Sequence, residues 1–117
     1  GAFLSGGLSI EAAFQECLPI TVVIDNNGGL DCISQQQERL FANGKHFATD
    51  FRDIPFHTMF EGLGGYGELV TKREDIGPAL RRAMKSGKTA CINVKCKGVI
   101  SPIVAATSDK RDKASIE

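Results

Sequence analysis

The sequence contains no apolar run long enough to cross a membrane. Its longest such run lies around Ile20 to Ile24, whereas a transmembrane helix needs roughly 20 apolar residues. A secretory signal peptide is not evident either, because Gly1–Leu8 has neither a basic start nor a cleavage pattern. This second absence excludes little, since the sequence does not begin with methionine. We therefore expect no membrane partner.

The sequence also lacks a net charge. Its 14 basic residues are balanced by 14 acidic residues, whereas a nucleic-acid-binding protein needs a basic excess or a basic stripe. The nearest approach to a stripe is Lys110, Arg111 and Lys113, which Asp109 precedes and Asp112 interrupts. We therefore expect no nucleic-acid partner.

The spacing of cysteine and histidine does not suit a zinc site. None of the four cysteines forms a Cys-x-x-Cys pair, and the sequence has two histidines, His46 and His57. Zinc ligands are usually spaced more closely than this. We instead expect buried, reduced cysteines in a cytoplasmic protein. The cysteines are Cys17, Cys32, Cys91 and Cys96.

Length and composition are those of one soluble globular domain. The sequence has 117 residues, which is too few for two domains. Hydrophobic residues make up 42% and charged residues 24%, the balance of an ordinary folded protein. We expect residues 1–106 to belong to one domain and residues 107–117 to form a polar C-terminal tail. A turn at Ser101-Pro102 is predicted beyond Gly98.

Three segments predict β-strands. Ile20–Ile24 is almost entirely β-branched and barely alternates, which is typical of a strand covered on both faces of a parallel sheet. Ala90–Val94 has the same character, and Tyr66–Val70 is a shorter candidate. Strong turn residues follow the first strand at Asp25–Gly29.

The first predicted helix precedes the first strand. Ser9–Leu18 has apolar residues at helical spacing, a suitable N-cap at Ser9, and a stop before Pro19. A second helix is predicted to begin at Asp53–Pro55 and to end at Gly64-Gly65. The predicted buried residues of these two helices are Ile10, Ala13, Phe14, Cys17, Phe56, Met59, Phe60 and Leu63.

A third helix is predicted before the last strand. It is expected to end at Gly87 and to begin near the capping-box spacing of Thr71–Glu74, with Pro78 either kinking it or delaying its start to about Gly77. Its predicted buried residues are Ile76, Leu80, Ala83 and Met84.

Residues 30–50 show no sustained pattern. We expect a long loop with at most a short helix at residues 35–40, and loops of this length are usually functional or mobile. The resulting alternation of helices and strands predicts an α/β fold, with a parallel sheet flanked by helices.

A candidate ligand site follows the first predicted strand. Doubly wound sheets bind ligands beyond the carboxyl ends of their strands, and Asn26-Asn27-Gly28-Gly29 lies at such an end. Asparagine offers neutral oxygen ligands, and glycine allows close approach of a backbone carbonyl, which suits a hard cation such as Mg²⁺. An ordinary turn between two elements would use the same residues, so the tetrapeptide alone leaves both interpretations open.

The beginning of the sequence favours the ligand site. Gly1–Gly7 is glycine-rich and leads into a helix, where backbone amides attract phosphate. Between Gly1 and Asn26 lie 24 residues. This arrangement resembles the thiamine-diphosphate signature, in which Gly-Asp-Gly precedes an Asn-Asn pair by about two dozen residues. Gly1 corresponds to its third position, so the Gly-Asp pair is not in this sequence.

The resemblance extends along most of the sequence, from Gly1 to about Pro102. The sequence resembles the family of thiamine-diphosphate-dependent enzymes, which includes oxalyl-CoA decarboxylase, 2-hydroxyacyl-CoA lyase and acetolactate synthase. The segments that carry it are Leu18–Ile24 with Asn26–Gly29, Phe60–Glu68, Ile76–Ala83 and Ala90–Val94.

The resemblance implies a thiamine-diphosphate-binding fold, present as part of a domain, and a set of site residues. Asn27 corresponds to the side-chain ligand of Mg²⁺, and Gly29 to the position whose backbone carbonyl binds the metal. Gly1 and Ala2 correspond to the backbone that holds the diphosphate of thiamine diphosphate. Asn26 belongs to the signature in a structural role. No residue of this sequence is expected to be catalytic.

Three departures from the family pattern accompany these similarities. Asp25 stands where relatives usually have an apolar or small residue. The Leu30–Ser34 segment has no aromatic residue, and Lys95–Lys97 replaces an Asp-Pro type ending. The carboxylate of Asp25 could support the asparagine pair or indicate a site that has changed.

The resemblance further implies a partner and an activity. A pyrimidine-binding domain, in the same or a partner chain, supplies the glutamate that activates the cofactor, and the parent enzyme is expected to be a homo-oligomer. Such an enzyme makes or breaks carbon–carbon bonds next to a carbonyl, as a lyase or transferase, and this chain is expected to be inactive alone. Two other interpretations remain: a small subunit of a two-chain thiamine-diphosphate decarboxylase, and a non-catalytic α/β module of the nucleotide-binding kind.

Overall fold

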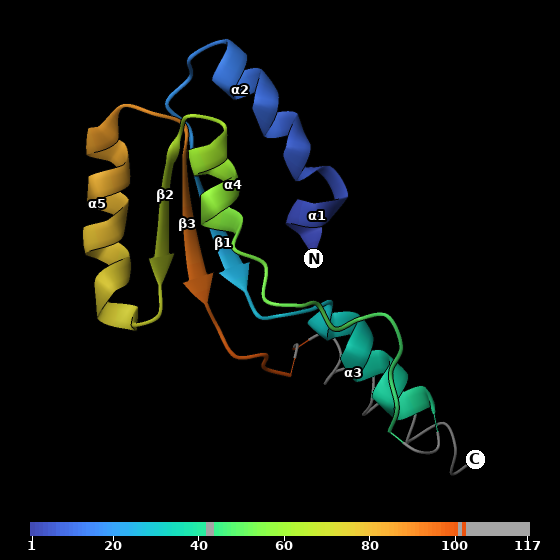
Figure 1. Cartoon of the computed structure of the whole chain (residues 1–117). Helices are drawn as coiled ribbons and strands as arrows, with labels where there is room; N and C mark the ends of the chain where they lie inside the picture. Colours follow the sequence, from blue (N-terminus) through green and yellow to red (C-terminus); the bar gives the residue numbers. More distant parts are fainter. Residues whose placement is uncertain (42–43, 101, 103–117) are drawn as a thin grey trace. The chain divides into compact units, whose positions relative to one another are not determined.

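The structure, a computed structural model, describes residues 1–41, 44–100 and 102. The chain forms two compact units (Figure 1). The first consists of Gly1–Asn27 with Asp53–Cys96, and the second of Gly28–Arg52 with the residues from Lys97 onward. Of the predicted Ser101-Pro102 turn the structure describes Pro102 alone, and the boundary at residue 106 and the polar tail fall outside the described ranges, so these three stay predictions.

A parallel sheet forms the centre of the first unit. Its described strands are β1 (Thr21–Asn26), β2 (Tyr66–Val70) and β3 (Ala90–Lys95). They lie in the order β1-β3-β2, and β3 pairs in parallel with both neighbours. This confirms the predicted α/β fold with a parallel sheet and all three predicted strands.

The strands differ in burial because they differ in their place in the sheet. Five of the six residues of β3 are buried, since this strand lies between the other two. In β1, Ile24 and Asn26 are buried whereas Val23 is 51% exposed. The prediction that Ile20–Ile24 is covered on both faces is therefore wrong. Here β1 is an edge strand of the described sheet, and one of its faces remains open.

Helices cover the two faces of the sheet (Figure 1). On one face α5 (Ile76–Ser86) packs its buried alanines against β2 and β3. On the other face α4 (Phe56–Gly62) packs against β2 and β3 and, with apolar side chains from the N-terminal helices, covers Ile24 of β1. Residues of β3 alternate between these two cores, as the side-chain period of a strand requires.

The N-terminal helical region is more interrupted than the sequence predicts. It consists of α1 (Ala2–Gly6), the 3-10 helix η1 (Gly7–Ile10) and α2 (Glu11–Gln15). Ser9 lies inside η1 rather than acting as a cap, and no side-chain cap bond is present at α2. Cys17 adopts a left-handed conformation with φ 51°. The helix therefore ends before Cys17, which is exposed rather than part of the predicted buried face.

The last helix begins after a 3-10 turn, η2 (Arg73–Asp75). Neither η2 nor α5 has a side-chain cap bond, so the predicted capping box at Thr71–Glu74 is not formed. Pro78 lies in the first turn of α5, where its missing N–H costs little. Gly87 ends the helix in the left-handed conformation with φ 66°, as predicted.

Three expected core residues on the helices are exposed instead. Met84 is 73% exposed, Leu63 47% and Met59 36%. In α5 the alanines Ala79 and Ala83 contact the sheet, and Met84 lies one position beyond that stripe. The apolar stripe of each helix is thus narrower than its composition suggests.

The cysteines are free thiols, and only Cys91 is buried. The expectation of four buried cysteines is therefore wrong for Cys17, Cys32 and Cys96. Cys91 lies on the central strand, where burial raises the pKa of its thiol to about 12. The exposed cysteines lie on the margins of elements, where no apolar layer covers them.

The second unit contains a longer helix than its sequence predicts. Residues predicted as a loop form α3 (Asp31–Leu40), and an isolated antiparallel bridge joins Gly29 to Asp50. The helix is stabilised locally by side-chain bonds such as that from the Ser34 hydroxyl to the Leu30 carbonyl. None of the described helices is both long and apolar enough to cross a membrane.

Candidate functional site

The carboxyl ends of the parallel strands lie at one edge of the sheet. The register pairs Asn26 at the end of β1 with Lys95 of β3, and Val70 at the end of β2 with Val94. This is the edge at which α/β sheets bind ligands. The structure therefore places the predicted asparagine pair at the expected end of β1.

Asn26 is held on both its side chain and its backbone. It is 7% exposed, its Nδ2 donates to the Ile54 carbonyl at 3.2 Å, and its own carbonyl accepts from the Cys96 N–H at 3.1 Å. These bonds tie the end of β1 both to the segment before α4 and to the residue after β3. The geometry favours an anchoring role for Asn26, and the partly exposed Asn27 follows it directly.

The backbone geometry of the second unit explains the two glycines of the turn. The Gly28 carbonyl accepts from the Phe51 N–H at 2.7 Å, and the Leu30 N–H donates to the Thr49 carbonyl at 2.8 Å. Gly29 therefore lies in the non-hydrogen-bonded position opposite Asp50, where its own carbonyl points away from the paired segment.

Gly29 cannot carry a side chain without a shift of the backbone. An added Cβ would lie 2.5 Å from the Thr49 carbonyl oxygen. The preceding Gly28 has φ +81°, a left-handed conformation that glycine adopts without strain. Both glycines are thus needed for the backbone path, which directs the Gly29 carbonyl away from the Thr49–Phe51 segment.

Gly1 caps α1 and Ala2 is its first residue, and the next residue, Phe3, fixes the position of this segment in the first unit. The Phe3 ring packs edge-on against Phe56 at 5.5 Å and lies 6.0 Å from Phe60. Ile54 and Phe56, two residues apart, thus contact Asn26 and Phe3 respectively. With five residues, α1 is too short for a strong helix dipole. Any phosphate contact here depends on individual backbone N–H groups.

A buried polar cluster lies beneath the end of β1 and was not singled out from the sequence. Asn93 of β3 is fully buried, and its Nδ2 lies 3.2 Å from His57 Nδ1 and 3.5 Å from the Ile54 carbonyl. The only sequence signal was an asparagine inside the apolar segment Ala90–Val94. Its partners are far away in sequence, so that signal could not identify them.

Asp25 faces the thiol of Cys96. Hydrogen bonding to this carboxylate, with burial, raises the pKa of Cys96 to about 11. The thiol therefore stays protonated near neutral pH and is a poor nucleophile. Asp25 is exposed, so its charge remains solvated.

The predicted metal ligands after β1 are oxygen atoms, which suit a hard cation, but they carry no charge. Within the part of the chain that the structure describes, no group of three or more His, Cys, Asp or Glu side chains could hold a metal ion. The residues predicted as metal ligands offer an amide oxygen and a backbone carbonyl, which Mg²⁺ accepts but binds weakly without a carboxylate or phosphate. These two oxygen ligands suit Mg²⁺, but they make up only part of the coordination shell that it needs.

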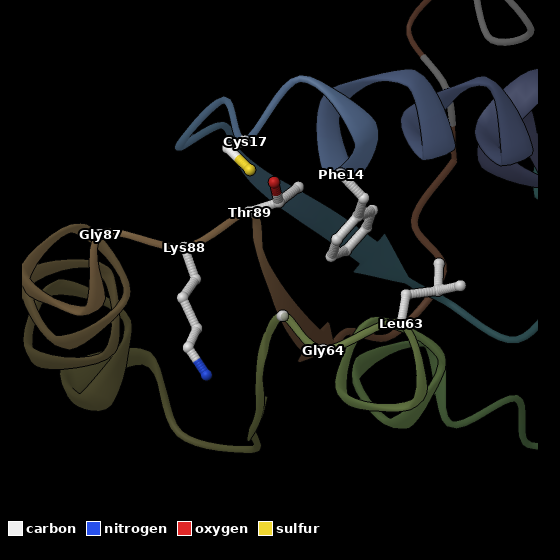
Figure 2. Close-up of a pocket in the computed structure, with 8 residues that line it drawn as sticks. Phe14, Cys17, Leu63, Gly64, Gly87, Lys88 and Thr89 are labelled. Atoms are coloured by element: carbon white, nitrogen blue, oxygen red, sulfur yellow. The ribbon is translucent and has the colours of Figure 1, made fainter.

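A small cavity of about 290 Å³ opens elsewhere on the first unit (Figure 2). Gly65 and Thr89 in its lining immediately precede β2 and β3, so it lies at the amino ends of these strands. Figure 2 shows Phe14 and Leu63 beside it. Because the asparagine pair lies at the carboxyl ends, this cavity is separate from the candidate site.

Outside the asparagine turn, His46 of the second unit lies between two carboxylates. Its Nε2 is 2.8 Å from Asp50 and its Nδ1 is 3.1 Å from Glu38. The hydrogen bond to Asp50 is the main cause that raises the pKa of His46 above its ordinary value of 6.5. His46 is therefore an electrostatic link between α3 and the residues that pair with Gly29.

This link predicts a pH dependence of the second unit. Because the folded-state pKa of His46 is raised, its contribution is fully present below pH 6.5 and is lost as the pH rises through the folded-state value. We expect the amide hydrogens near Asp50 to exchange faster as His46 deprotonates, beyond the intrinsic effect of pH. His46→Gln should remove that extra dependence, and Asp50→Asn should bring the histidine titration by NMR back toward 6.5. An unchanged titration in Asp50→Asn would show that the pair does not form.

The parallel sheet with helices on both faces places the chain among the α/β proteins. Residues 1–94 match the model of the thiamine pyrophosphate enzyme family for its C-terminal TPP-binding domain. The chain belongs to this family, as the resemblance in its sequence predicts.

Relatives support the same assignment. The chain is similar to the sulfoacetaldehyde acetyltransferase of Alcaligenes xylosoxydans xylosoxydans, with 30% identity over 82% of the chain and 16% of that protein. It is 35% identical to an acetolactate synthase large subunit of Corynebacterium glutamicum over 71% of the chain and 14% of that protein. A large subunit of acetolactate synthase from Mycobacterium tuberculosis shares 32% identity over 80% of the chain and 17% of its own length. The chain thus spans about a sixth of these proteins.

Proposed function

We propose that this chain holds the diphosphate and Mg²⁺ end of thiamine diphosphate in an enzyme that makes or breaks carbon–carbon bonds next to a carbonyl. An acetolactate-synthase-like carboligase is the leading candidate, because two of the three relatives described above carry that name. A 2-hydroxyacyl-CoA lyase or decarboxylase is the second candidate for the parent enzyme, which we expect to work in the cytoplasm.

The observation that carries the proposal is the anchored end of β1. Asn26 is fixed through its side chain and its carbonyl, so the next residue, Asn27, begins from a defined position at the ligand-binding edge of the sheet. We assign the Asn27 side-chain oxygen and the Gly29 carbonyl to Mg²⁺. The backbone at Gly1 and Ala2 would hold the diphosphate.

The cofactor, when bound, supplies a thiazolium ring that stabilises negative charge on the reacting carbon. The residues of this chain would bind and orient its diphosphate end. The reacting end would lie against a pyrimidine-binding domain of the same or a partner chain, in a homo-oligomer. Exposed apolar side chains in the first unit fit such a partner, including Leu8 at 73% and Val23 at 51%.

Calorimetry with Mg²⁺ and thiamine diphosphate tests the proposal on two chains. The 117-residue chain has two neutral protein ligands and should bind weakly or not measurably. An extended chain that adds the Gly-Asp pair and a preceding strand should bind about ten- to a hundredfold more tightly, because a charge-assisted contact contributes about 1.5–3 kcal/mol.

The Asn27→Ala variant of the extended chain should lose this binding. Gln36→Ala is its matched control, because it removes an exposed amide side chain from α3 of the second unit. The control should bind as tightly as the unchanged extended chain. If the extended chain binds no better than the 117-residue chain, or if Asn27→Ala is silent, the assignment of the site is wrong.

A further inference from the structure

The fully buried Asn93 is unusual for the face of the sheet on which it lies. Two of its neighbours on this face are apolar, namely Cys91 two residues earlier on β3 and Ile24 beside it on β1. Its Oδ1 has no hydrogen-bonding partner among the described residues. Burying an amide whose oxygen has no partner is unfavourable compared with an apolar side chain of similar size. Stability of the fold alone therefore does not explain this asparagine.

The contacts of Asn93 lead to the candidate site. Its Nδ2 faces the Ile54 carbonyl at 3.5 Å, and the same carbonyl accepts from Asn26 Nδ2 at 3.2 Å. The Phe56 N–H also donates to this carbonyl, at 3.0 Å. Ile54 is thus the point where the central strand, the end of β1 and the start of α4 are joined.

The Ile54 carbonyl fixes the orientation of the Asn93 amide, and the amide in turn fixes the tautomer of His57. The Ile54 carbonyl is an acceptor, so the amide must present its nitrogen rather than its oxygen to it. The same nitrogen lies 3.2 Å from His57 Nδ1, which must then accept and leave the proton of a neutral imidazole on Nε2. The backbone of His57 is itself closely packed, since a Cβ on Gly67 would lie 2.3 Å from the His57 carbonyl oxygen.

From this chain of contacts we propose that Asn93 and His57 are positioning residues for Asn27. His57 contacts the Asn93 amide, and this amide contacts the Ile54 carbonyl. The carbonyl in turn accepts from Asn26, which sets the direction of the next residue. Neither Asn93 nor His57 touches the cofactor in this proposal. The expected effect on cofactor binding rests on the proposed function. The effect on the structure around Asn27 can be tested without any ligand.

The structural test uses NMR on the 117-residue chain. We expect His57 to be in the Nε2–H tautomer, and Asn93→Val to shift the side-chain amide signals of Asn26 and Asn27. Ile92→Val is the control, because it trims a buried residue of the same strand on the opposite face. It should lower the melting temperature but leave those amide signals in place. A Nδ1–H tautomer, or equal shifts in both variants, would overturn the proposal.

A second pair of variants covers the case in which Asn93→Val does not fold. His57→Leu removes the acceptor, whereas His57→Gln can keep one. We expect the leucine variant to shift the Asn27 amide signals and the glutamine variant to restore them. Identical signals in the two variants would contradict a positioning role for His57.

The functional test uses the extended chain and the same calorimetry. Asn93→Val should weaken binding of Mg²⁺ and thiamine diphosphate about tenfold, as changes behind a metal ligand commonly do, whereas Ile92→Val should leave affinity unchanged. Unchanged affinity in Asn93→Val, with a binding parent chain, counts against the positioning role. If the parent chain itself does not bind, the proposed function fails, and the NMR result alone decides the positioning role.

Discussion

Replacing Phe60 by alanine is expected to destabilise the first unit by about 3–5 kcal/mol, the usual cost of removing a fully buried aromatic ring. Phe60 is 1% exposed and packs at 5.8 Å against Phe14 and at 6.0 Å against Phe3. Its loss would therefore open a cavity between α4 and the N-terminal helices. The free energy of unfolding of a native protein is typically about 5–15 kcal/mol, so this loss would remove a large part of it.

Urea unfolding followed by tyrosine fluorescence measures this effect. Tyr66 is the only tyrosine, the sequence has no tryptophan, and Tyr66 lies in β2 of the first unit. Met59→Ala is the control on the same helix, because Met59 is 36% exposed. We expect it to cost less than about 1 kcal/mol. Equal losses in the two variants would show that Phe60 is not a core residue.

The second large effect is expected at Gly67 of β2. An alanine Cβ there would lie 2.3 Å from the His57 carbonyl oxygen and 2.8 Å from the His57 carbonyl carbon. Because these are backbone atoms of a packed helix, the clash cannot be relieved by a side-chain rotation. We expect Gly67→Ala to destabilise the first unit by about 3 kcal/mol, at the upper end of the range for overpacking.

Gly62→Ala is the matched control for Gly67→Ala. Gly62 is the last residue of α4, and an added Cβ meets nothing within 4 Å. Alanine is favoured over glycine in a helix, so this variant should gain up to about 1 kcal/mol. The same urea titration applies to both. A Gly67→Ala variant as stable as the unchanged chain would mean that α4 and β2 are farther apart than the structure shows.

Both changes also affect the candidate site, because both disturb the packing that holds α4 in place. Phe60 fixes the helix against the N-terminal segment, and Gly67 allows close packing of its first turn on β2. Ile54 and His57, which lie at that end of the helix, contact Asn26 and Asn93. Displacement of α4 should therefore disturb the asparagine end of β1 even in molecules that remain folded.

The strands and the asparagine turn could be predicted because their signals are local. A β-branched run such as Ile20–Ile24 favours a strand wherever it occurs, and the Asp25–Gly29 turn residues mark its end. Helix α3 could not be predicted as easily. Its sequence, Asp31–Leu40, is mostly polar, and local side-chain bonds such as Gln35 to Asp31 support it in place of an apolar stripe.

Burial was predicted less well than element type, because burial depends on neighbours. The residues of β1 do not indicate that this strand lies at the edge of the described sheet, so the exposure of Val23 could not be predicted. The same holds for Met84, whose exposure follows from which residues of α5 face the sheet. The left-handed conformation of Cys17, which ends the N-terminal helical region, was likewise not marked by a glycine.

The sequence by itself determined the order of the strands along the chain, the family, and the position of Asn26 and Asn27 after a strand, because each depends on residues close together in the chain. Only the tertiary structure decided what holds that strand end. Asn26 and Asn93 reach the Ile54 carbonyl across 28 and 39 residues. The two glycines of the turn are explained only by the pairing of Gly29 with Asp50. Such contacts form when segments that are distant in the sequence pack together, so a local pattern of residues cannot predict them.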